Sequence, residues 1–232
     1  MYLIRGIGNI ETFNRKFPNQ PMSGTIGNFD GLHLGHQAIL KQVKDKALES
    51  SSASLVFFTE PHASEYFAAN DLNSKPPPRI CPWREKVKLL KNFGIDFAFF
   101  LQFNKSLKTM TPQIFLDEVL AQLNLKHLII GDDFRFGAQR AGDFELLKNW
   151  GKTNGTKVIA NKTVSRNGLR VSSTRIREAL LQSDADSEEG VEGDGKTSFG
   201  GNTSHHDVGG RADQSSDAAE VGAEAEGPRE RF

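Results

Sequence analysis

Short apolar runs alternate with amphipathic stretches over residues 1–182 of the chain. Five of these runs are four to six residues long and rich in Phe, Val and Ile, which is typical of buried strands. They lie at residues 25–29, 54–59, 96–101, 127–130 and 157–160. The stretches between them are long enough to hold a helix each.

These intervening stretches carry apolar residues at helical spacing. Thr111 before Pro112 is typical of an N-cap followed by a first-turn proline, and Gly94 is typical of a helix end. The predicted helices cover residues 37–49, 83–93, 112–123 and 146–151, and a last one begins at Ser172 or Ser173 and ends near Gln182. Residues 71–82 contain four prolines and predict an irregular loop.

Strands that alternate with helices predict an α/β fold built on a parallel sheet, because parallel neighbours need a crossover connection. Helices then pack on the faces of the sheet. Ligands bind such sheets at the carboxyl ends of the strands. The segments that follow the predicted strands are therefore where chemistry is expected.

The composition changes abruptly after Gln182. Residues 183–232 hold 13 acids against 4 bases, a net charge of −9, whereas residues 1–182 have a net charge of +9. The later stretch contains nine glycines and neither Leu nor Ile, so it cannot bury enough apolar surface to offset its chain entropy. We expect one globular domain over residues 1–182 and a disordered, low-complexity acidic tail over residues 183–232. A frameshifted coding end or natural divergence would each produce such a tail, and the abrupt break favours the frameshift.

Charge and cysteine content exclude several classes of protein. The 29 Lys and Arg residues balance 29 Asp and Glu residues, which argues against a nucleic-acid binder with a broad basic surface. The single cysteine, Cys81, excludes a disulfide framework and a cysteine zinc site. No apolar run approaches the ~20 residues that span a bilayer, and residues 1–4 are too short for a signal peptide. We expect a cytoplasmic monomer or weak oligomer without nucleic-acid or membrane partners.

A glycine-rich segment, residues 27–36, joins the first predicted strand to its helix. Glycines at such a turn let the backbone approach a ligand, and the helix start offers free N–H groups and a partial positive charge to an anion. His33 and His36 add side-chain donors that suit phosphate oxygens. The alternative is a structural turn in which one histidine caps the helix and the other is exposed.

A second cluster lies at residues 170–177, where three hydroxyl residues are flanked by arginines. The hydroxyls can simply cap the last helix. Arginines beside the positive end of a helix dipole are unfavourable by a few tenths to about 1 kcal/mol each, so an anion such as phosphate accounts for them. Arg177 lies four residues after Ser173 and can return to the face that presents the helix start.

These two clusters resemble the nucleotidylyltransferase superfamily. Further stretches are similar to bacterial FAD synthetase, the FMN adenylyltransferase module of bifunctional riboflavin kinase/FAD synthetase. The motifs lie at residues 27–36, 58–62, 79–86, 131–143 and 170–177. Their common order makes the similarity specific, and it spans residues 1–182. The resemblance implies the nucleotidylyltransferase fold, a Rossmann-like parallel sheet with helices on both faces.

The resemblance also implies a set of ATP-binding residues. In this family the glycine-rich segment surrounds ATP, and its two histidines contact the phosphates. Asp133 matches the position that helps to hold ATP and its Mg²⁺, so the metal is carried by ATP and no direct metal motif is expected. The implied ATP-binding residues are Gly27, Phe29, Asp30, His33, His36, Asp133, Arg170, Ser173, Thr174 and Arg177. Of these, the implied catalytic residues are His33, His36, Arg170 and Arg177.

For the flavin, the resemblance implies the turn Glu60-Pro61-His62 together with Phe67. Phe136 falls where an aromatic ring can lie against a flavin. Ala63 departs from the family, which often has proline there. A looser turn with a weaker affinity for flavin would follow.

The implied activity is that of FAD synthetase, which transfers AMP from ATP to FMN and gives FAD and pyrophosphate. No glycine-rich opening or Pro-Thr-Ala-Asn motif of a riboflavin kinase domain occurs in residues 183–232, so kinase activity is expected to be absent. Two alternatives stay open. One is another nucleotidylyltransferase of the superfamily, and the other is a non-catalytic flavin- or nucleotide-binding remnant of a truncated bifunctional enzyme.

Overall fold

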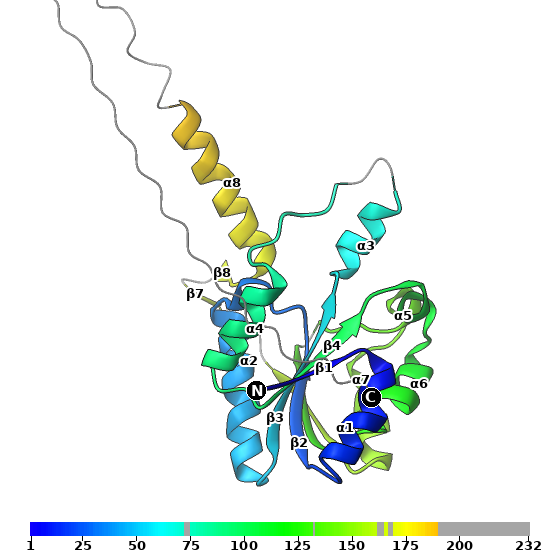
Figure 1. The fold of residues 1–232 in the computed structure, drawn as a ribbon. Coiled ribbons are helices and arrows are strands. Elements are labelled where there is room, and N and C mark those ends of the chain that lie inside the picture. The colour runs from blue at the N-terminus through cyan, green and yellow to red at the C-terminus, as the bar shows by residue number, and fades with distance from the viewer. Residues whose placement is uncertain (72–74, 132, 162–164, 167–168, 190–232) are drawn as a thin grey trace, which may run out of the picture. The chain divides into compact units, whose positions relative to one another are not determined.

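A six-stranded parallel sheet runs through the computed structural model (Figure 1). Its strands lie in the order β1-β4-β3-β2-β5-β6, and every neighbouring pair is parallel. Their bounds are β1 (Tyr2–Arg5), β2 (Met22–Ile26), β3 (Ala53–Glu60), β4 (Phe97–Gln102), β5 (Leu125–Gly131) and β6 (Lys157–Asn161). The predicted α/β fold with a parallel sheet is confirmed.

The structure describes residues 1–71, 75–131, 133–161, 165–166 and 169–189; the side chains of residues 165–166, 169–170 and 183–189 are outside that description. The chain divides into two units, Met1–Val191 and Glu192–Phe232. The second unit, and residues 190–232 of the predicted tail, lie outside the described residues.

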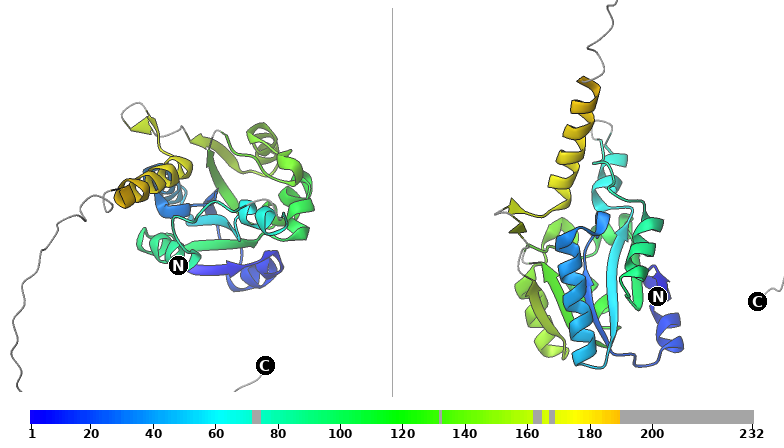
Figure 2. Two further views of the ribbon diagram at one scale, coloured as in Figure 1. Left: turned by 90° about the horizontal axis from the view of Figure 1, so that it is seen from above. Right: turned by 90° about the vertical axis from the view of Figure 1, so that its left-hand side faces the viewer.

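Helices cover both faces of the sheet (Figures 1 and 2). One face carries α2 (Leu34–Glu49) and α4 (Trp83–Asn92), and the other carries α1 (Ile10–Lys16), α6 (Pro112–Phe115) with the π-helical turn Leu116–Leu120, and α7 (Phe144–Thr153). The remaining helices are α3 (Ala63–Ala69), α5 (Lys105–Thr109), α8 (Ser173–Glu189) and the 3-10 turns Ile7–Asn9, Asp30–Leu32 and Ala138–Arg140. The strands β7 (Ser165–Arg166) and β8 (Leu169–Arg170) form an antiparallel pair.

Alternation along β3 shows why the chain forms two cores. Leu55 and Phe57 pack into the core on the α1, α6 and α7 face, while Val56 and Phe58 pack into the core beneath α2 and α4. All four side chains are fully buried. A strand that is apolar on both faces belongs in the middle of a sheet covered on both sides, and it is recognisable in the sequence as a continuous apolar run.

Several elements differ from the sequence prediction, which contains no counterpart of α1, α3, α5, β7 or β8. The edge strand β1 was not predicted, because it is only four residues long and ends in the charged Arg5. The strand β2 ends at Ile26 rather than at residue 29, since Phe29 adopts a left-handed conformation with φ of 49°. The helix α8 continues past Gln182 to Glu189, in keeping with a stretch that contains no glycine or proline before Gly190.

The strand order places a topological switch point between β2 and β5. From β2 the chain adds β3 and β4 on one side, and it then returns to add β5 and β6 on the other side. Ligands of open α/β sheets bind where the order reverses, beyond the carboxyl ends of the strands. The helices α3 and α8 both stand at this end of the sheet (Figures 1 and 2).

Candidate active site

A cleft of about 260 Å³ opens at the switch point. Its walls come from the ends of β2, β5 and β6 and from the starts of α2 and α8. Six of the residues predicted to bind ATP line it: Gly27, Phe29, His33, His36, Asp133 and Ser173. The topology therefore brings together residues that are separated by more than a hundred positions in the sequence.

A larger hollow, of about 540 Å³, lies between α1 and the π-helical turn. It is lined by Ile10, Glu11, Arg15 and Glu118 among others, and no histidine borders it. Its size alone does not make it a site, because its charged side chains Glu11 and Arg15 pair with each other and are largely exposed to solvent.

His33 caps the start of α2 and shapes the cleft wall. Its Nδ1 accepts the backbone N–H of His36 at 3.4 Å, so the neutral ring carries its proton on Nε2, which donates to Ser173 Oγ at 3.2 Å. Gly35 lies in a tight space between the two histidines, because a Cβ there would lie 3.2 Å from the His33 ring and 3.3 Å from the carbonyl oxygen of Val171, closer than an ordinary van der Waals contact.

The two imidazoles stack on each other with their centroids 3.7 Å apart. Burial and the neighbouring His33 lower the pKa of His36 to about 3. Burial also lowers the pKa of His33, although the negative charge of Asp30 opposes this. Both rings are therefore neutral at pH 7, so each carries one N–H and no positive charge. In the structural alternative one histidine would be exposed, whereas His36 is partly buried and lines the cleft.

The start of α8 borders the same cleft through Val171, Ser172 and Ser173. Ser172 Oγ accepts the N–H of Arg175 at 3.4 Å, as an N-cap does. The contact between His33 and Ser173 joins this helix start to the start of α2. Each start carries unpaired N–H groups and a partial positive charge, so the cleft favours an anion from two sides.

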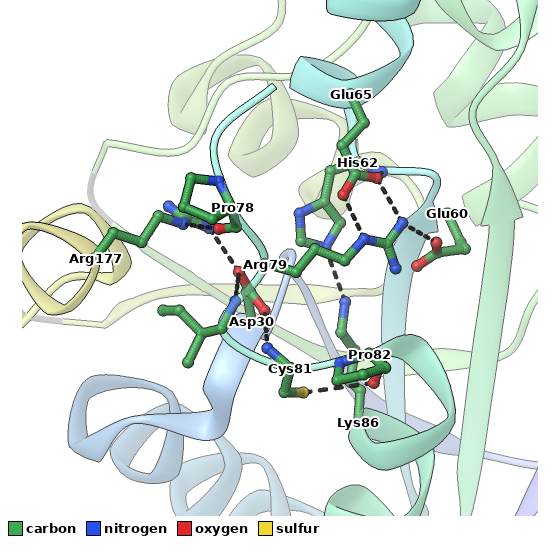
Figure 3. A network of polar contacts seen from close by, with 11 residues as sticks. Asp30, Glu60, His62, Glu65, Pro78, Arg79, Cys81, Pro82, Lys86 and Arg177 are labelled. Atoms are coloured by element: carbon green, nitrogen blue, oxygen red, sulfur yellow. Dashed lines mark hydrogen bonds and ion pairs between the residues drawn. The ribbon is translucent and has the colours of Figure 1, made fainter. Parts of the chain in front are cut away.

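Asp30 and Arg177, both predicted to bind ATP, contact each other instead of lining the cleft (Figure 3). The Arg177 Nη2 lies 2.5 Å from Asp30 Oδ2, and its Nε donates to the Pro78 carbonyl at 2.7 Å. The Asp30 carboxylate also accepts the N–H groups of Cys81 at 3.0 Å and Ile80 at 3.1 Å. Burial alone would raise the pKa of Asp30, but these donors outweigh it and lower the pKa. Asp30 thus fastens α8 and residues 75–82, here called the proline-rich loop, to the glycine-rich segment.

The turn predicted to meet the flavin, residues 60–62, links β3 to α3. Together with residues 63–65 at the start of α3 it is here called the flavin-side turn. Arg79 donates to the carboxylates of both Glu60 and Glu65, at 2.5 Å from Nη2 to Glu65 Oε2 (Figure 3). The backbone N–H of His62 donates to the same Glu65 oxygen at 2.9 Å. Burial would raise the pKa of Glu65, but Arg79 and His62 hold it below the usual value. The turn is therefore closed by one arginine from the proline-rich loop.

The two aromatic residues predicted for the flavin occupy different environments. Phe67 on α3 is 47% exposed, which suits a ring that meets a ligand. Phe136 is only 8% exposed, and its ring packs against Phe115 at 5.6 Å. The backbone of Phe136 pairs with Gly142, and its ring belongs to the core on the α1, α6 and α7 face, whereas the resemblance implies a ring against a flavin. Phe134 is the aromatic residue of this segment that lines the cleft.

Three further residues predicted to bind ATP differ in their position relative to the cleft. Asp133 lines the cleft with an exposed carboxylate. Thr174 is exposed in the first turn of α8 but does not line the cleft, and the side chain of Arg170 lies outside the described residues. Within the described part of the chain, no three His, Cys, Asp or Glu side chains are grouped as a metal site requires.

Comparison with known proteins agrees with this geometry. The family model described as FAD synthetase matches residues 16–175, which include the cleft and the flavin-side turn. The chain belongs to the FAD synthetase family. The five motifs that suggested this family from the sequence all fall within or overlap the matched region.

The chain is also similar to several proteins named "Bifunctional riboflavin kinase/FMN adenylyltransferase". The Escherichia coli K12 protein is 38% identical over 181 residues, which are 78% of this chain and 55% of that protein. The Pseudomonas fluorescens protein is 38% identical over 187 residues, 80% of this chain and 57% of that protein. The chain thus spans just over half the length of these members of the FAD synthetase family.

A solved structure extends the comparison to the fold. The crystal structure of a macrolide-efflux protein from Streptococcus pneumoniae is 26% identical, with a TM-score of 0.64. It covers 78% of this chain, and the match takes in 58% of that structure. The parallel sheet and its helices are therefore shared well beyond the glycine-rich segment. Among the described residues, no helix is both long and apolar enough to cross a membrane.

Two residues near the site had no role in the sequence prediction. Asn28 Oδ1 accepts a hydrogen bond from Thr59 Oγ1 at 3.2 Å, which joins the end of β2 to the end of β3. Lys86 on α4 is fully buried and lies 2.9 Å from His62. Asn28 could have been found from its place in the glycine-rich segment. Lys86 lies among charged residues in a helix that otherwise looks solvent-exposed there, so its burial has no signal in the sequence.

Proposed function

We propose that this chain is an FMN adenylyltransferase that makes FAD. An oxygen of the FMN phosphate attacks the α-phosphorus of ATP and forms the new phosphoanhydride bond. The bond between the α- and β-phosphates breaks, and pyrophosphate leaves. No protein nucleophile is needed, because the FMN phosphate is itself the attacking group, so catalysis consists of positioning and charge stabilisation.

One observation carries this proposal: two helix starts and two neutral imidazoles meet in a single cleft at the switch point. A nucleotide triphosphate is the ligand that such a set suits, since the N–H groups of both helix starts and of the His36 ring can reach several phosphate oxygens, and the Nε2–H of His33 can exchange Ser173 for a phosphate oxygen. The neutral histidines are available as donors throughout the physiological pH range. The same donors would stabilise the charge that builds on the oxygens in the transition state.

We propose that Mg²⁺ reaches the site bound to ATP. Carboxylate oxygens are ligands that Mg²⁺ prefers, and Asp133 presents such a group to the cleft. When bound, the ion would neutralise charge on the departing pyrophosphate. The roles of Arg170, Thr174 and Arg177 toward the phosphates remain predictions of the family motif.

The flavin is proposed to enter from the side of β3. The flavin-side turn and the exposed Phe67 lie there, and the bond between Asn28 and Thr59 marks the boundary with the ATP cleft. FMN bound on this side would bring its phosphate toward the α-phosphate of ATP across the ends of β2 and β3. A reaction between two phosphorylated substrates requires this proximity.

Pyrophosphate release tests the acceptor. With ATP and Mg²⁺, the purified chain should release pyrophosphate when FMN is added, and riboflavin should not replace FMN. Riboflavin with ATP should also yield no FMN, since we propose that this chain has no riboflavin kinase activity. We also propose that it works in the cytoplasm as a monomer or weak oligomer. Formation of FMN would contradict the proposed lack of riboflavin kinase activity. Release of pyrophosphate with another phosphorylated acceptor but not with FMN would favour a different nucleotidylyltransferase.

Ala63 offers a test of the flavin-side turn. It is the first residue of α3, where the N–H has no partner within the helix, and the preceding His62 has φ of −61° and ψ of 148°, which a residue before proline prefers. Ala63→Pro should therefore stabilise the fold by about 0.4–1 kcal/mol. It should also lower the KM for FMN several-fold and leave kcat and the KM for ATP unchanged. A raised Tm with an unchanged KM for FMN would show that stiffness of the turn does not limit flavin binding.

A further inference from the structure

Lys86 is one of the most deeply buried side chains in the described part of the molecule, with no exposed surface. A buried ammonium loses its hydration, and an apolar side chain of the same length would pack there at lower cost. Lys86 Nζ lies 5.2 Å from the centre of the Phe58 ring, which recovers part of that loss. Its position therefore calls for a role that an apolar residue could not fill.

The polar contact of Lys86 is with the flavin-side turn. Its Nζ lies 2.9 Å from His62 Nε2, and Figure 3 shows it reaching up from α4 to that ring. An ammonium group can only donate, so Nε2 accepts and the His62 proton lies on Nδ1. Burial lowers the pKa of His62, and the charge of Lys86 lowers it further, which keeps the ring neutral and able to accept.

Apolar packing alone does not fix the turn. The helix α3 that follows it buries only Ala68, and its Phe67 is 47% exposed. The rings of Tyr66 and Phe67 meet Phe103 edge-on at 5.4 Å and 5.9 Å, and polar contacts add to this packing in setting the orientation of the turn. These polar contacts come from two cations. Arg79 donates to the Glu60 and Glu65 carboxylates, and Lys86 donates to the His62 ring. The two positive charges balance Glu60 and Glu65, so the network is neutral as long as His62 is neutral.

We propose that Lys86 is a positioning residue for flavin binding, which acts through His62 to hold the flavin-side turn in its binding conformation. This inference rests on the proposed function, since it assumes that the turn meets FMN. Arg79 closes the turn from outside, whereas Lys86 supports it from the core. Loss of Lys86 leaves the turn attached but free to shift, so it weakens flavin binding more than chemistry.

The test compares Lys86→Met with Lys88→Met in the full chain. Lys88 lies on the same helix but is exposed and pairs with Glu85, so it controls for the lost charge. Lys86→Met should raise both the KM for FMN and the Kd for FMN, measured by flavin fluorescence, about tenfold, as expected when a binding group shifts by a fraction of an ångström. The KM for ATP and kcat should stay within about twofold, and Lys88→Met should match the wild type.

The outcomes separate this inference from the proposed function. A folded Lys86→Met protein with wild-type affinity for FMN would overturn the positioning role, even if the wild type makes FAD. A wild type that binds FMN but makes no FAD would overturn the proposed function and leave the fluorescence comparison valid. Should Lys86→Met not fold, nitrogen-15 NMR of the wild type decides, with the His62 signal assigned by a His62→Gln variant. A proton on Nδ1 supports the contact, and a proton on Nε2 overturns it.

Discussion

Replacing His36 by alanine is expected to lower kcat for FAD formation by about 10²–10³-fold, the usual cost of removing one transition-state donor. The ring stacks on His33 at 3.7 Å and lines the cleft, while its pKa of about 3 keeps it uncharged. We therefore expect it to act by donating a hydrogen bond and not by its charge. The KM values for ATP and FMN should change much less than kcat, because the contact strengthens in the transition state.

Two controls accompany His36→Ala. His36→Asn keeps an N–H donor of shorter reach and should recover part of kcat. His127 lies toward the opposite end of the sheet, with its Nδ1 3.0 Å from Ser23 Oγ, so His127→Ala should leave kcat within about twofold. Circular dichroism would verify that each variant is folded. An unchanged kcat in folded His36→Ala would remove that histidine from the mechanism.

Replacing Asp30 by asparagine is expected to have the largest effect on stability. Asp30 is 1% exposed, and its carboxylate holds two backbone N–H groups and the Arg177 guanidinium. Asparagine has nearly the same shape as aspartate, but it carries no negative charge. Its NH₂ group would face the backbone N–H groups or the guanidinium that now donate to the carboxylate. The expected loss is about 2–3 kcal/mol, since the partly exposed Arg177 guanidinium and at least one backbone amide lose a buried acceptor. Thermal unfolding should show a fall in Tm of about 5–10 °C.

The pH dependence of this loss follows from the lowered pKa of Asp30. A carboxyl group whose pKa is lower in the folded than in the unfolded state stabilises the fold fully above the unfolded value of about 3.9. That stability disappears as the pH falls through the folded pKa. The gap in unfolding free energy between wild type and Asp30→Asn should therefore be constant above about pH 5 and shrink below pH 4.

An exposed aspartate provides the matched control for Asp30→Asn. Asp45 on α2 pairs with Lys41 at 2.9 Å, but its side chain is half exposed. Exposed ion pairs contribute little, so Asp45→Asn should change the unfolding free energy by less than about 0.5 kcal/mol. Equal effects of the two substitutions would show that Asp30 does not fasten α8 and the proline-rich loop to the glycine-rich segment.

The sequence was sufficient wherever burial produces a regular pattern. The run over residues 54–59 predicted β3 because that strand is covered on both faces. Thr111 and Pro112 predicted the start of α6 because capping is a local interaction. The glycine-rich segment predicted residues that line the cleft, because a strand end, a tight turn and a helix start follow one another directly in the sequence there.

Partners chosen by tertiary structure could not be predicted in this way. Arg177 occupies a phosphate-binding motif, yet it reaches across 147 residues to Asp30. Phe136 looks like a ligand-facing ring but belongs to the core on the α1, α6 and α7 face. Lys86 resembles the exposed lysines beside it, and only the packing of α4 against the core reveals its burial. In each case the decisive contact comes from a segment whose position the local sequence does not specify.

Direct detection of FAD is the measurement that tests this account most directly. Purified wild-type chain, incubated with ATP, Mg²⁺ and FMN, is analysed by chromatography for FAD and by a coupled assay for pyrophosphate. The wild type is expected to form FAD and pyrophosphate in equal amounts, and His36→Ala is expected to form them at least about 10²-fold more slowly. A wild type that binds both ATP and FMN but forms no FAD would contradict the proposed function.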